Sequence, residues 1–320
     1  MFNSHFLVVL TYHYIRNFCG LNKGIHPVSL TDFECQLNLL LEKFNKLEPE
    51  ELNDFLRKET SLKKNSFLLT FDDGLKDHYE NVLNILNRYK IKGIFFISTS
   101  PIFENKMPVV HKIHFLRSIL NLKKFISILT FALPSEWKNY KLSDKQVLNA
   151  EKTYPFDTLQ DKKTKYFLNF ILPSEVIDST TSKMLKILKY NEKELCNELF
   201  LTKEQIVEIH NDGHIIGLHG NTHETLSKFN KKKLKQDLQS CQNYLNSILG
   251  FEPSILSYPY GRKEAIPFKH LDVLDSLRIK DSFTLFTGIN DLNTDRKLLK
   301  RYTPNQLFTK FNNDFKVDFT

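Results

Sequence analysis

The chain has 320 residues, of which 41% are hydrophobic and 26% charged, and its formal net charge is +8. This length is enough for one large α/β barrel or two ordinary domains, and the composition is that of a globular protein. With only 10 glycines, a collagen-like or long flexible chain is excluded. Part of the charge lies in Lys231, Lys232 and Lys233, which we interpret as a solvated helix face because no nucleic-acid recognition motif accompanies it. A basic surface would nevertheless favour anionic partners.

Cysteine usage and the N-terminus bear on the compartment. The four cysteines are widely spaced and form no CxxC pair, which argues against a zinc finger and a disulfide framework: Cys19, Cys35, Cys196 and Cys241. The apolar run at residues 6–10 is too short for a signal peptide and lacks a basic segment before it. No stretch approaches the roughly 18–20 apolar residues of a membrane span. We therefore expect a reduced, cytoplasmic protein without a transmembrane segment, and peripheral membrane contact through the basic surface stays open.

Apolar patterns in the first hundred residues alternate between strand and helix. Residues 6–12 form a β-branched apolar run typical of a buried strand, and residues 30–45 carry apolar side chains at helical spacing. A second strand is predicted at residues 66–71, a helix at 79–89 and a third strand at 93–98. Such alternation indicates a parallel α/β architecture.

The pattern changes between residues 101 and 198. Helical runs such as residues 111–120 and 183–190 alternate with polar, proline-containing joints, and no buried strand is evident. We interpret this segment as a helical insertion, a lid or substrate-binding cap, within a single domain that spans residues 1–320.

The alternation resumes near residue 200. A capping box of Thr202 and Gln205 predicts the start of a helix, and Gly250 is placed to end a later one. The predicted elements are, in order, a helix ending at 211–213, a strand at 214–219, a helix at 231–249 and strands at 255–258 and 284–287.

Three polar clusters stand where predicted strands end. They are Asp72-Asp73-Gly74, His219-Gly-Asn-Thr-His223 and Ser257-Tyr-Pro-Tyr-Gly261. In parallel α/β barrels the loops at the carboxyl ends of the strands converge on the active site. The clusters are therefore candidate site residues.

Asp72 and Asp73 are adjacent carboxylates at the end of an apolar run. Such carboxylates repel each other and lose solvation, and a divalent cation would remove much of that cost. Adjacent residues point in different directions, so that one could bind metal while the other faces substrate. An ordinary Asp-Asp-Gly turn is the alternative explanation.

His219 and His223 are spaced i, i+4, which suits two imidazoles on one metal. His210 and His214 share this spacing, but they straddle a predicted helix end, so we interpret that pair as accidental. One carboxylate with two imidazoles predicts Zn²⁺, with positions left for water and substrate.

The three clusters together resemble the motifs of the polysaccharide deacetylase family, which includes the chitin deacetylases and NodB-like enzymes of carbohydrate esterase family 4. Thr70-Phe-Asp-Asp-Gly74 is similar to the first motif. His219-Gly-Asn-Thr-His223 is similar to the second, His-(Ser/Thr)-x-x-His, with Gly220 at the Ser/Thr position. Ser257-Tyr-Pro-Tyr-Gly261 resembles the third, in the Tyr-Pro-Tyr-Gly form of one branch. The resemblance covers roughly residues 5–100 and 200–290.

The resemblance implies an α/β fold, a distorted parallel (β/α) barrel, and a role for each motif residue. Asp72 would be the general base, and Asp73, His219 and His223 would hold the divalent metal. The backbone N–H of Tyr260 would hold the tetrahedral oxyanion, with Tyr258 as a further oxyanion or substrate residue.

Two departures from the family pattern leave roles open. The third motif commonly begins with Arg, so with Ser257 there the arginine that orients the base is missing or comes from elsewhere. The late Leu-x-His motif that supplies the general acid has no match near residues 284–289. His13, His111 and His114 are candidates for the acid or for substrate contact, and a packing role is equally open for each.

The resemblance therefore implies a hydrolase that removes an N-acetyl or other acyl group from an amino sugar or glycan precursor in surface polysaccharide biosynthesis. The substrate would be nucleotide-linked, lipid-carrier-linked or oligomeric, and the positive charge suits a phosphate-bearing one. The alternatives are an O-deacylase and a catalytically inactive carbohydrate-binding barrel. Nucleic-acid binding rests on lysines alone, and we expect none.

Overall fold

A computed structural model describes residues 5–17, 25–57, 59, 61–154, 157–309 and 314–319. The chain divides into two compact units. The first comprises Met1–Phe18, Pro27–Lys106 and Cys196–Thr320, and the second Cys19–His26 and Met107–Leu195. Whether the units form one domain stays a prediction. Cys35 and Cys241 are free cysteines, and Cys19 lies outside the described residues.

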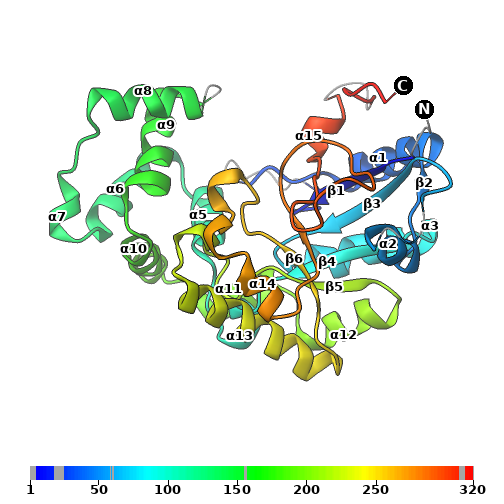
Figure 1. Ribbon diagram of the computed structural model, residues 1–320. Coiled ribbons are helices and arrows are strands. Elements are labelled where there is room, and N and C mark those ends of the chain that lie inside the picture. The colour runs from blue at the N-terminus through cyan, green and yellow to red at the C-terminus, as the bar shows by residue number, and fades with distance from the viewer. Residues whose placement is uncertain are drawn as a thin grey trace. The chain divides into compact units, whose positions relative to one another are not determined.

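The first unit is built on a parallel sheet (Figure 1). Its strands follow the order β1-β3-β4-β5-β6-β7, and β2 also pairs with β3. The strands are β1 (Leu7–Tyr12), β2 (Asn45–Lys46), β3 (Ser66–Phe71), β4 (Gly93–Ile97), β5 (Ile215–Leu218), β6 (Ile255–Ser257) and β7 (Asp281–Phe283).

Both faces of the sheet are buried, which explains the near-continuous apolar runs in the sequence. On β1, Val8 and Leu10 pack into one hydrophobic cluster while Leu7 and Val9 pack into another. Alternate residues of a strand face opposite sides of a sheet, so the two clusters are two layers of core.

Helices of the first unit lie between consecutive strands, and one follows the last strand. They are α1 (Leu30–Lys43), α2 (Pro49–Leu56), α3 (Leu83–Tyr89), α4 (Ser100–Phe103), α12 (Lys203–Asn211), α13 (Lys231–Leu249), α14 (Asp272–Ser276) and α15 (Pro304–Leu307). A π-helical turn, His78–Val82, precedes α3. The predicted capping box of Thr202 and Gln205 opens α12. Gly250 ends α13 in the left-handed conformation, as predicted.

One predicted strand was wrong. The last strand is Asp281–Phe283, and residues 284–287 lie outside any strand. The polar residue Asp281 is tolerated in this buried strand because Arg296 donates two hydrogen bonds to its carboxylate, at 2.6 and 3.0 Å. The apolar pattern alone therefore placed this strand at residues 284–287, just after the strand that the structure shows at Asp281–Phe283.

A short segment, residues 299–302, links the two edge strands. The N–H groups of Thr284 and Leu299 bond it to the β7 side, at 2.8 Å to Leu299 O and 2.9 Å to Ser282 O. On the β1 side, the N–H of Thr11 bonds to Tyr302 O and that of Tyr302 to Val9 O. The sheet thereby curls into a half-barrel, which confirms the predicted (β/α) barrel fold.

Among its described residues the second unit contains helices and no strand. Its helices are α5 (Val109–Ile119), α6 (Leu122–Ala132), α7 (Ser135–Lys138), α8 (Asp144–Thr153), α9 (Leu159–Tyr166) and α10 (Ser174–Ile187), and α11 (Glu192–Leu199) crosses the boundary into the first unit. No described helix of either unit is long and apolar enough to cross a membrane.

Candidate active site

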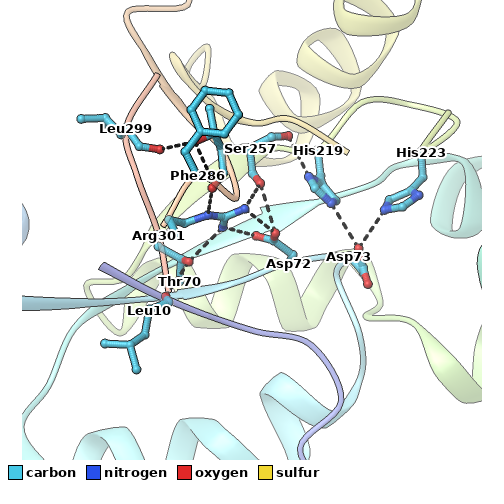
Figure 2. A network of polar contacts seen from close by, with 11 residues as sticks. Leu10, Thr70, Asp72, Asp73, His219, His223, Ser257, Phe286, Leu299 and Arg301 are labelled. Atoms are coloured by element: carbon cyan, nitrogen blue, oxygen red, sulfur yellow. Dashed lines mark hydrogen bonds and ion pairs between the residues drawn. The ribbon is translucent and has the colours of Figure 1, made fainter. Parts of the chain in front are cut away.

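The three polar clusters converge at the carboxyl ends of the strands, as Figure 2 shows. Asp72 and Asp73 directly follow β3, His219 directly follows β5, and Ser257 is the last residue of β6. Neighbouring parallel strands present their carboxyl ends at one edge of the sheet, and this brings side chains nearly 200 positions apart into contact.

Asp72 is clamped by a buried arginine, Arg301, on the segment that links the edge strands. The guanidinium donates to both carboxylate oxygens of Asp72, Nη1 to Oδ1 and Nη2 to Oδ2, each at 2.8 Å. Its other N–H groups bond to Thr70 Oγ1 at 3.0 Å, Ser257 Oγ at 2.8 Å and Thr284 O at 2.9 Å. All five donors of the arginine are therefore satisfied without water.

This clamp fixes the ionisation of Asp72. Burial by itself would raise the pKa of Asp72, but the charges of Arg301 and His219 and the hydrogen bonds from Arg301 outweigh it. The pKa of Asp72 therefore lies well below its ordinary value, and the group is a carboxylate at any physiological pH.

Asp73 faces the two predicted imidazoles. Its Oδ1 lies 3.2 Å from His219 Nε2 and 3.0 Å from His223 Nε2. Burial would lower the pKa of His219, but the charges of Asp72 and Asp73 outweigh burial, and the pKa is raised. A proton or a cation is thus favoured between these side chains.

The three side chains have the donor set and spacing of a metal site. Their ligand atoms lie within 4.8 Å of one another, and all three residues are buried. Ligand atoms around a tetrahedral Zn²⁺, with bonds of about 2.0–2.2 Å, lie roughly 3.3 Å apart, close to the distances seen. The Nδ1 of His219 also lies 2.8 Å from Ser257 O, a contact that orients the ring.

Backbone strain is concentrated at the same place. Among the described residues, seven non-glycine residues have positive φ, and three of them are Asp73, His223 and Tyr260. Such conformations cost about 1–3 kcal/mol and persist where the surroundings impose them, typically at functional sites.

Comparison with known proteins agrees with this geometry. The family model described as polysaccharide deacetylase matches residues 59–120 and 146–283, more than half of the chain. The chain belongs to the polysaccharide deacetylase family. No curated protein matches the sequence.

Solved structures support the fold. The deacetylase PplD of Streptococcus pyogenes has a TM-score of 0.59 at 17% identity, over 95% of both chains. IcaB of Ammonifex degensii has a TM-score of 0.55 at 16% identity, over 94% of this chain and 92% of that one. The deacetylase domain of BpsB from Bordetella bronchiseptica has a TM-score of 0.53 at 14% identity, over 93% and 95%.

The two tyrosines of the third deacetylase motif have different surroundings. Tyr260 is 41% exposed, and its ring lies 5.1 Å from that of His223. Tyr258 is fully buried in the core, where its hydroxyl donates to Lys297 O at 3.1 Å. This position favours a packing role for the Tyr258 side chain over the predicted contact with substrate.

The three candidate acids remain unassigned. His13 lies close enough to Asp72 for its charge to lower the pKa of that carboxyl, and its carbonyl oxygen lies 2.9 Å from His78 Nε2. His111 and His114 belong to the second unit, where their rings contact each other edge to face at 5.9 Å.

Arg301 is the site residue that sequence reasoning missed. The deacetylase pattern has an arginine at the position of Ser257, and here Arg301 reaches the same carboxylate from 229 positions beyond it. The local sequence offers one weak sign of a buried arginine: the charged residues Lys300 and Arg301 lie between two apolar residues, Leu299 and Tyr302, that are buried in the structure.

Proposed function

We propose that this deacetylase-family protein is a metal-dependent hydrolase that removes an N-acetyl group from an amino sugar of a surface polysaccharide or its precursor. The observation that carries the proposal is an ionised Asp72, held by Arg301, beside the cluster of Asp73, His219 and His223.

Asp72 is proposed as the general base. A carboxylate has about four lone-pair positions, and Arg301 and Ser257 use three of those on Asp72. Oδ1 accepts one hydrogen bond in the structure and Oδ2 two, so Oδ1 has room to take a proton from an attacking water.

The low pKa of Asp72 makes it a weak base, so the nucleophile must be acidic. When bound at Asp73, His219 and His223, a divalent ion would supply that acidity and polarise the acyl carbonyl. One carboxylate and two imidazoles are donors that suit Zn²⁺.

The tetrahedral oxyanion is proposed to be held by the backbone N–H of Tyr260. Tyr260 lies beside the cluster, and its left-handed backbone is of the kind that functional sites impose.

The acyl group is proposed to be acetyl. PplD, which shares the fold, was solved in complex with acetate. The net charge of +8 favours a substrate that carries phosphate, such as a nucleotide-linked or lipid-carrier-linked sugar, over a neutral oligomer.

The test is acetate release from a panel of N-acetylated amino sugars: nucleotide-linked, lipid-linked and oligomeric. We expect release by zinc-loaded wild type and a loss of roughly 10²–10⁴-fold in Asp72→Asn, because the base is removed while the metal ligands stay. His219→Ala should lose both release and metal. His210→Ala is the matched control, since His210 belongs to the other His-x-x-x-His pair and should retain activity.

The alternatives give different results. Release from O-acetyl but not N-acetyl sugars would make the protein an O-deacylase. Tight metal binding with no release from either class would indicate a carbohydrate-binding barrel without catalysis.

A further inference from the structure

The loop between His219 and His223 is held by a carboxylate that belongs to none of the three motifs. Asp237, on α13, accepts the N–H of Asn221 at 2.9 Å on Oδ2. Its Oδ1 accepts the N–H of Thr222 at 3.1 Å and the Thr222 hydroxyl at 2.8 Å. Asp237 is only 7% exposed, and hydrogen bonds to a buried carboxylate are among the stronger ones in proteins.

Gly220 is matched to Asp237. Its φ is +73°, and a Cβ on this residue would lie 2.9 Å from Asp237 Oδ2, closer than real contacts allow. The family motif has Ser or Thr at this position. In this chain a side chain there would push the carboxylate away from the N–H of Asn221, and this clash, together with the positive φ, accounts for the glycine.

The same loop is tied on its other side to the segment after β4. The carbonyl of Asn221 accepts the N–H of Ser100 at 3.0 Å. The side chain of Asn221 accepts from Thr99 Oγ1 at 2.7 Å and donates to Glu104 Oε1 at 2.8 Å. The backbone between the two imidazoles is therefore fixed from two directions.

We propose that Asp237 is a positioning residue that presets His219 and His223 for the metal ion without touching it. His223 has a strained φ of +56°, and the bonds from Asn221 and Thr222 to Asp237 oppose relaxation of the loop. The affinity for the ion then depends on a carboxylate outside the ligand set. This inference rests on the metal site of the proposed function, but not on the reaction or its substrate.

The experiment measures zinc affinity of the purified full chain by competition with a chromophoric chelator. We expect Asp237→Ala to weaken binding about 10–100-fold, the usual effect of removing a group that orients metal ligands. The zinc affinity of Asp237→Asn, which retains one acceptor oxygen, should lie between those of wild type and Asp237→Ala. This variant replaces Asp237→Ala in the test if the alanine variant folds poorly. In the metal-free protein, the amides of Asn221 and Thr222 should exchange hydrogen faster in either variant.

A double-mutant cycle tests the match with Gly220. Gly220→Ala should weaken zinc binding by displacing Asp237 and by straining the left-handed backbone, so its effect should be clearly smaller in the Asp237→Ala background, where only the backbone strain is left. Equal effects in both backgrounds would mean that Gly220 acts by its backbone alone, which would overturn the proposed pairing.

Gln242 provides the matched control. It is buried on the same helix and donates to Pro253 O and Leu277 O, both at 3.0 Å. Gln242→Ala should lower thermal stability yet leave zinc affinity unchanged. An equal loss of affinity in this variant, or an unchanged affinity in Asp237→Ala, would overturn the proposal, as would a wild type that binds no zinc. A wild type that binds zinc in this Asp237-dependent way but releases no acetate would contradict only the proposed reaction.

Discussion

Arg301 in the first unit and Lys112 in the second are both fully buried cations with every N–H donor bonded. The five donors of Arg301 bond to Asp72 and to three oxygens at strand ends. The three donors of Lys112 bond to Asp178 at 2.9 Å, Ser182 at 2.7 Å and Glu192 at 2.8 Å. Burial and complete bonding therefore do not by themselves distinguish a functional cation from a structural one.

The difference lies in the carboxylates. The Asp72 side chain is 3% exposed and held bidentately, and it also accepts a hydrogen bond from Ser257, whose carbonyl faces His219. The carboxylates on Lys112 come from α10 and α11, and their side chains remain 28% and 25% exposed. Lys112 thus ties three helices together, whereas Arg301 sets the charge and direction of one carboxylate.

The largest effect is expected at Arg301. Arg301→Met would leave the Asp72 carboxylate buried without its cation, which typically costs about 3–5 kcal/mol of unfolding free energy. The pKa of Asp72 would rise because burial is no longer opposed, and acetate release should fall at least about 100-fold. Urea unfolding and acetate assays measure the two effects.

Arg301→Lys sharpens this prediction. Lysine keeps the charge but has only three donors and no planar fork. We expect partial recovery of stability and little recovery of activity. Wild-type acetate release from a folded Arg301→Met would show that Asp72 does not need its clamp.

A smaller effect, on stability alone, is expected at Lys112. Lys112→Met should cost about 2–3 kcal/mol, less than at Arg301, because the carboxylates of Asp178 and Glu192 can regain water. Acetate release per folded molecule should match wild type. A folded variant with lost activity would remove the distinction between the two cations.

Sequence patterns predicted the parts of the first unit that depend on burial. The strands that begin at Leu7, Ser66 and Gly93 are apolar runs because both faces of the sheet are covered. Asp72, Asp73, His219 and His223 were predicted because their motifs follow the predicted strands at 66–71 and 214–219, and the structure brings all four together (Figure 2).

What the sequence could not predict are pairings between distant charges. Arg301 lies in a charged stretch with no motif, and only the closure of the sheet brings it to Asp72. The strand at Asp281–Phe283 was not predicted for the same reason. Asp281 interrupts the apolar pattern, and only its pairing with Arg296 allows it to lie in a buried strand. A pattern of single residues does not reveal a partner of opposite charge.

His214 is a third buried basic residue, and unlike Arg301 and Lys112 it is uncharged at neutral pH. Its Nδ1 accepts the N–H of Gly93 at 3.1 Å, and its Nε2 is buried with no hydrogen-bond partner among the described residues. Burial first, and then the charge of Lys92, lower the pKa of His214 to about 4, against the weaker opposite effect of Asp212.

The sign of the pH effect follows from this lowered pKa. Between pH 6.5 and 4 the unfolded chain binds a proton that the folded chain does not, so stability is lost as the pH falls. From pH 7 to 5 the loss from this group is about 2 kcal/mol. In His214→Asn, whose amide oxygen can accept from Gly93, urea unfolding should show a pH dependence smaller by that amount. An unchanged dependence would mean that the pKa of His214 is the same in the folded and the unfolded protein.

The smallest effect is expected at Ser257, which occupies the family's arginine position. Ser257→Ala removes one hydroxyl that accepts from Arg301 and donates to Asp72 at 3.1 Å, and should cost about 1 kcal/mol of unfolding free energy. Thr70→Val is the matched control, since its hydroxyl also accepts from Arg301 but does not touch Asp72.

Equal losses of stability are expected in the two variants, with the larger loss of acetate release, less than about tenfold, in Ser257→Ala. The backbone carbonyl of Ser257 that faces His219 is kept in this variant, so zinc affinity should not change. If Thr70→Val lost as much activity as Ser257→Ala, the hydroxyls would act only by holding Arg301. A larger loss of acetate release in Ser257→Ala than in Thr70→Val would mean that two residues orient Asp72. One is the buried Arg301, and the other is Ser257, which occupies the position where the family commonly has its arginine.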